Sequence, residues 1–145
     1  MIRLARSERT KRTVAPLAAP LARRFVGGES AAAAVATARS LRDEHGVTAS
    51  LFYLGEYVSD SAVIEETIIA TLAAIELLGS EGLDVNVSVD PTAIGHLASD
   101  ELCAQNAQRL ARAAAAYGAG NTNSIVLDME RAATEIVNIV TEERK

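Results

Sequence analysis

Residues 47–54, VTASLFYL, decide the class of fold that this sequence predicts. Their β-branched and aromatic side chains form a nearly continuous apolar run, which is typical of a strand covered on both faces in a parallel sheet. Two further runs, at residues 83–89 and 124–129, predict a second and a third strand. A helical pattern follows each of the three, so the repeating unit is a strand and then a helix.

These helices are predicted from caps and from apolar residues at helical spacing. Ser59, Asp60 and Ser61 can cap the first, Ser99 starts the second, and an alanine-rich helix between Ser30 and His45 precedes the first strand. The apolar faces comprise Ile64, Ile68, Leu72 and Ile75 in the first, Cys103, Ala107, Leu110 and Ala114 in the second, and Ile136, Val137 and Val140 in the third. Alternating strands and helices imply right-handed parallel crossovers, and hence an α/β fold.

The length of the chain limits how much of a barrel it can form. A barrel of eight strand-helix units needs at least about 200 residues, whereas this chain has 145. We therefore expect a partial (β/α) barrel with about three parallel strands and flanking helices over residues 25–145. A basic arm with a short helix is expected over residues 1–24. Three strands leave two open edges, which predicts self-association or pairing with a complementing barrel fragment.

Charge, cysteine content and hydrophobicity bear on the partners and the cellular compartment that the sequence predicts. The net charge is -5, yet seven of the 14 Lys and Arg residues lie before Phe25, where Glu8 is the only acid. A short basic arm is more often solvated than bound, so no nucleic-acid partner is expected. Cys103 is the only cysteine, which favours a reducing compartment. The sequence has neither a secretory signal pattern nor a run of about 20 apolar residues, and we expect a cytoplasmic protein without a transmembrane segment.

Polar residues gather where the predicted strands end. Glu56 follows the first, Asp90, Thr92 and His96 surround the end of the second, and Asp128 and Glu130 follow the third. In a βα barrel this end is the functional face, although strand ends also need polar residues to meet solvent. His96 could act as an acid-base group or a metal ligand, but it has no nearby His or Cys at ligand spacing, so no metal site is expected.

Four segments resemble the proline dehydrogenase family in their residues, their order and their spacing. They are RRFVGGES at residues 23–30, YLGE at 53–56, NVSVDPTAIG at 86–95 and LDME at 127–130. The resemblance covers roughly residues 21–131. It implies a distorted βα barrel that holds FAD at its carboxyl end, oxidises L-proline to pyrroline-5-carboxylate and passes the electrons to a quinone.

The resemblance also implies roles for particular residues. Asp128 and Met129 would lie beside the flavin ring and the substrate pocket, with Asp128 as a polar positioner. Glu56 would form a gate ion pair with an arginine from a later part of the barrel. Asp90 occupies a position where many family members have a lysine, so an anion would face the substrate carboxylate and the developing charge of the flavin. Asp90 and Asp128 are the candidate catalytic residues.

The family's remaining flavin and carboxylate contacts come from middle and late barrel segments, which this sequence lacks. The chain on its own is therefore expected neither to bind FAD nor to oxidise proline. The alternative function is a non-catalytic α/β interaction module, or a decayed fragment, that associates through its open sheet edge.

Overall fold

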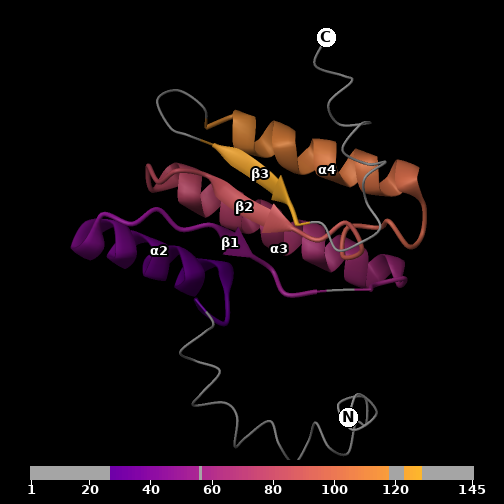
Figure 1. Ribbon diagram of the computed structural model, residues 1–145, viewed down its shortest axis with the longest axis horizontal. Coiled ribbons are helices and arrows are strands. Elements are labelled where there is room, and N and C mark those ends of the chain that lie inside the picture. Colours follow the sequence, from indigo (N-terminus) through magenta and orange to yellow (C-terminus); the bar gives the residue numbers. More distant parts are fainter. Residues whose placement is uncertain (1–26, 56, 118–122, 129–145) are drawn as a thin grey trace, which may run out of the picture.

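The computed structural model describes residues 27–55, 57–117 and 123–128. In this part of the chain helices and strands alternate, as the sequence predicts (Figure 1). In chain order the elements are α2 (Ala31–His45), β1 (Leu51–Phe52), α3 (Ser61–Ser80), β2 (Asn86–Val89), α4 (Asp100–Ala115) and β3 (Ser124–Leu127). The basic arm at residues 1–24 and the helical pattern after residue 129 lie outside the described residues.

Each helix begins at a cap that the sequence indicates. The side chain of Ser30 accepts a hydrogen bond from the amide of Ala33 at the start of α2. Asp60 caps α3 and Ser99 caps α4 in the same way. These side chains satisfy amide groups that have no partner inside the helix, and so they fix where each helix starts. Gly46 ends α2 in the left-handed conformation, with φ of 65°.

The sheet contains three parallel strands in the order β1-β2-β3. Leu51 of β1 pairs with Val87 of β2, which pairs with Ile125 of β3. Each pair of neighbouring strands is connected by a helix, α3 or α4, as parallel pairing requires. The predicted α/β class with three parallel strands is confirmed.

Helices cover one face of this sheet. Figure 1 shows α3 behind the strands, with α2 towards β1 and α4 towards β3. Val87 and Val89 point into this layer, where they join Ile68 and Ile75 of α3 and Leu110 of α4 in the core. The predicted apolar faces of α3 and α4 therefore supply the core, and burial of these side chains is the main term that stabilises the fold.

None of the described helices covers the other face of the sheet. Phe52 and Val126, which lie on either side of Ser88 in the strand register, are 37% and 47% exposed. The prediction that residues 47–54 are covered on both faces is therefore wrong for the part of the chain that the structure describes. No further strand or helix among the described residues covers these side chains, so they face outwards. The paired part of this run is also shorter than predicted, at Leu51–Phe52.

Candidate functional site

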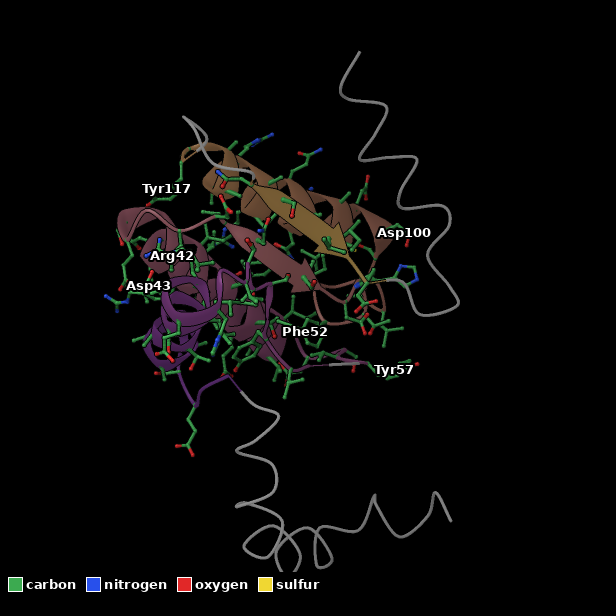
Figure 2. The ribbon with its side chains drawn as sticks, turned by 60° about the vertical axis from the view of Figure 1, so that its left-hand side comes forward. Arg42, Asp43, Phe52, Tyr57, Asp100 and Tyr117 are labelled. Atoms are coloured by element: carbon green, nitrogen blue, oxygen red, sulfur yellow. The ribbon has the colours of Figure 1, made fainter. Side chains whose placement is uncertain are left out.

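The carboxyl ends of the parallel strands form a common rim. Asp90 follows β2, Asp128 follows β3, and the amide of Asp128 donates to the main-chain oxygen of Val89 at 2.9 Å. Figure 2 shows Tyr57 and Asp100 at this end of the sheet, with Arg42 and Tyr117 at the opposite end. The fold thus brings Asp90 and Asp128 together at one rim.

Asp90 is buried, with 4% exposure, and its carboxylate serves the turn that follows β2. Its Oδ1 accepts hydrogen bonds from the amide and from the hydroxyl of Thr92, both at 2.8 Å. Its main-chain oxygen accepts from the amides of Ala93 and Ile94 at 3.0 and 3.2 Å. This arrangement is an Asx turn, in which a short carboxylate replaces a main-chain acceptor.

Thr92 connects that turn to the loop between β1 and α3. Its hydroxyl oxygen accepts a hydrogen bond from the amide of Tyr57 at 3.0 Å. Its main-chain oxygen accepts from the amide of Val58 at 3.2 Å. Tyr57 has φ of 55°, a conformation that bulky residues seldom adopt. The loop at the end of β1 is therefore held by the turn at the end of β2.

His96 lies beside the first turn of α4. Its Nδ1 is 2.8 Å from Oδ1 of Asp100, but the two groups are not aligned for a hydrogen bond, and the buried Nδ1 atom has no other partner. Within residues 27–55, 57–117 and 123–128, no three His, Cys, Asp or Glu side chains come together as a metal site would require. His96 therefore forms at most a two-residue pair with Asp100.

Cys103 is buried beneath the same turn, where its Sγ lies 3.7 Å from the main-chain oxygen of Pro91. Burial raises the pKa of the Cys103 thiol to about 11, and the negative charges of Asp100 and Asp90 add to the effect. A thiol is nucleophilic as the thiolate, so this cysteine is an inert packing residue at neutral pH.

Two of the predicted site residues, Glu56 and Met129, lie outside the described residues. Asp128 is exposed at the rim, whereas the Asp90 carboxylate is occupied by Thr92. Sequence reasoning named Thr92 as a polar residue near the end of β2 but did not foresee its contact with Tyr57. The Asp-Pro-Thr pattern signals an Asx turn and could have indicated the first half of that contact.

A groove of about 680 Å³ lies between β1, the start of α2 and α3. Its walls are mostly small or apolar. They comprise residues 27–31 and Ala34 at the start of α2, residues 50–54 around β1, Ala70, Thr71 and Ala74 of α3, and Val87. The groove therefore offers shape and apolar surface but few groups that could perform chemistry.

The fold and the strand-end rim define the class as a parallel α/β protein built from consecutive strand-helix units. No protein-family model matches the chain. The chain is similar to proline dehydrogenase 1 of Bacillus subtilis subsp. natto, with 30% identity over 109 residues, or 75% of this chain and 34% of that protein. The same enzyme of Bacillus subtilis strain 168 is 29% identical over the same length.

These similarities support a distant relationship to proline dehydrogenases, and the match spans about a third of the length of those relatives. The resemblance seen in the four sequence segments is thus supported at the level of a distant relationship. Among the described helices, none combines the length and the hydrophobicity needed to cross a membrane.

Proposed function

We propose that this chain forms the first three strand-helix units of a proline dehydrogenase-like barrel, in which FAD-dependent oxidation converts L-proline to pyrroline-5-carboxylate. The observation that carries the proposal is the similarity over 109 residues to proline dehydrogenase 1. Three parallel strands in sequence order, with polar residues collected at their carboxyl ends, supply the scaffold that such a barrel requires. A quinone is the proposed electron acceptor.

In this proposal residues 25–145 form one partial-barrel domain behind the basic arm at residues 1–24. Asp128, exposed at the rim, is a polar positioner beside the flavin ring, and Met129 lines the same pocket. Glu56 supplies the acidic partner of a gate ion pair. Asp90 acts from the adjacent strand end, through the turn that its carboxylate stabilises.

The charges at the rim limit which part of FAD the described residues can contact. Asp90, Asp100 and Asp128 are carboxylates, and the described arginines all lie on α2 and α4. Three of them pair with acids away from the rim residues: Arg39 with Glu81 at the end of α3, Arg42 with Asp43 of α2, and Arg109 with Glu65 of α3. Carboxylates can accept from the N–H group of a flavin ring but repel a diphosphate. The described rim therefore disfavours the diphosphate, and the exposed Asp128 is the carboxylate there that could accept from the ring N–H group.

A chimaera tests the proposal. The 109-residue stretch of Bacillus subtilis proline dehydrogenase 1 that aligns with this chain is replaced by this chain's residues. The purified chimaera is then assayed for flavin absorbance and for L-proline-dependent reduction of a dye. We expect both, and we expect Asp128→Ala to lower turnover by about tenfold or more, since it removes a group placed beside the reacting atoms. A folded, flavin-loaded chimaera without proline turnover would contradict the proposal.

A smaller exchange covers the case in which the large chimaera does not fold. Residues 86–96 alone are placed in the Bacillus enzyme, so that the Asp-Pro-Thr turn is tested in a native barrel. Turnover that falls to the level of the uncatalysed reaction in this folded variant would show that the turn is incompatible with proline oxidation.

The groove beside β1 favours a second candidate, an α/β module that binds an extended segment of another chain. Its walls are mostly apolar, and β1 is an edge strand with main-chain groups available for strand addition. In this case the chimaera has no proline turnover, while the purified chain forms a defined complex with its partner.

A further inference from the structure

We infer that Thr92, oriented by Asp90, is a positioning residue that sets the conformation of the loop between β1 and α3 at the strand-end rim. Its importance for proline oxidation rests on the proposed function, but the geometry of the loop does not. Tyr57 and Val58 form the part of this loop that contacts Thr92. Glu56, the proposed gate residue, directly precedes Tyr57 in the sequence.

The hydroxyl of Thr92 both donates and accepts a hydrogen bond. It has one proton, which it donates to Oδ1 of Asp90, so its oxygen is left to accept from the amide of Tyr57. A carboxylate acceptor polarises the hydroxyl and makes its oxygen a stronger acceptor in turn. Asp90 therefore selects the orientation in which Thr92 can hold Tyr57.

Thr92 holds both main-chain nitrogens that flank the Cα of Tyr57. The amide of Tyr57 donates to its hydroxyl oxygen, and the amide of Val58 donates to its main-chain oxygen. Those two nitrogens help define φ and ψ of Tyr57, which has φ of 55°. An uncommon conformation of this kind persists only where the surroundings impose it. The two contacts with Thr92 are among the interactions that hold Tyr57 in this conformation.

The turn that carries Thr92 is itself fixed from below by α4. Pro91, Thr92, Ala93, Ile94 and Gly95 are all buried. Asn106 of α4 donates through Nδ2 to the main-chain oxygen of Ile94 at 3.0 Å. A buried, hydrogen-bonded turn moves less than a loop that is exposed at Tyr57, so the loop follows the turn. The turn after β2 therefore sets the position of the loop after β1.

Amide hydrogen exchange of the full chain, measured by NMR, tests this assignment. Thr92→Val keeps the shape of the side chain but removes the hydroxyl, and we expect exchange at the Tyr57 amide to accelerate about fivefold or more, the change for one lost hydrogen bond. Thr92→Ser keeps the hydroxyl and should restore slow exchange. The amide of Asp128, bonded to Val89 at the same rim, is the internal reference and should not change.

Unchanged exchange at Tyr57 in a folded Thr92→Val variant would overturn the assignment, as would a Thr92→Ser variant that fails to restore slow exchange. If Thr92→Val does not fold, the Asp90→Asn variant is used to test the same contact. It keeps an oxygen acceptor without its charge, and we expect Tyr57 to exchange faster than in the parent but more slowly than in Asp90→Ala. Equal rates in these three proteins would refute the role of Asp90. Since exchange requires neither flavin nor proline, its outcome is separate from that of the chimaera.

Discussion

Burial controls the chemistry of Cys103 and gives a pH dependence that can be measured. The pKa of its thiol rises from 9.0 to about 11, chiefly through burial. Between these values the unfolded chain releases a proton that the folded chain retains, so the unfolded state is favoured as the pH rises. We therefore expect the free energy of unfolding to fall between about pH 9 and about pH 11, as followed by urea unfolding.

Cys103→Ala is the matched control for that measurement. The variant lacks the thiol, so the difference between its pH profile and that of the parent isolates the Cys103 contribution from other groups that titrate in this range. A thiol reagent gives a second readout, with slow labelling of the folded protein at pH 8 and rapid labelling in denaturant. Parallel pH profiles, or rapid labelling of the folded chain, would contradict a buried thiol of raised pKa.

At the residue scale, sequence patterns predicted position better than they predicted contacts. Asp90 and Asp128 were expected at one end of the sheet from the strand pattern alone, and the structure has them there. The contact between Thr92 and Tyr57 joins residues 35 positions apart. Such a contact depends on the three-dimensional approach of two loops, which no local spacing encodes. The catalytic and flavin-contact roles of Asp90, Asp128, Met129 and Glu56 remain predictions.

At the scale of one element, the cap of α4 gives a prediction of stability. The hydroxyl of Ser99 accepts from the amide of Leu102 at 3.0 Å. Ser99→Ala removes this acceptor, and we expect the free energy of unfolding to fall by about 1 kcal/mol, whereas Ser99→Thr should keep most of it. Urea unfolding followed by circular dichroism measures the change. Ser59→Ala, an exposed position ahead of α3, should change stability by less than about 0.5 kcal/mol.

The elements also differ in how well the sequence predicted them. Helix α3 was predicted closely, because its cap at Asp60 and its apolar face with Ile64 and Ile68 are local signals. Strand β1 was predicted less well. Its run of apolar residues indicated a strand covered on both faces, but Phe52 is 37% exposed because no described helix packs on that face of the sheet. A short apolar run indicates that its side chains favour burial, but it does not indicate whether another element is present to cover them.

At the scale of the whole molecule, the open face of the sheet is the feature that sets behaviour in solution. Among the described residues, helices α2, α3 and α4 pack on one face of the sheet and form the core there (Figure 1). The uncovered side has main-chain groups at the sheet edges and apolar side chains on its face. Edge groups can bond to water, whereas exposed apolar area has no such compensation. The apolar side chains therefore decide whether the molecule remains a monomer.

We accordingly expect the purified chain to self-associate through the open face of the sheet. Phe52, Leu54 and Val126 are 37%, 72% and 47% exposed around it, and burying apolar area contributes about 25 cal/mol per Å². Sedimentation velocity over a dilution series should show species heavier than 15.2 kDa that dissociate on dilution. The triple variant Phe52→Ser, Leu54→Ser, Val126→Thr should shift the chain towards monomer.

The helical side of the molecule provides a control that distinguishes association through the sheet face from non-specific hydrophobic association. Val63 and Ile69 of α3 are also exposed, at 43% and 57%, but they lie on the opposite layer. Val63→Thr with Ile69→Thr removes apolar area from that layer and should leave the association unchanged, because the sheet face is intact. Association that weakens equally in both variants would point to non-specific contacts. A monodisperse 15.2 kDa parent that unfolds cooperatively would mean that the open face needs no cover, and that the three-stranded α/β unit is a self-sufficient domain.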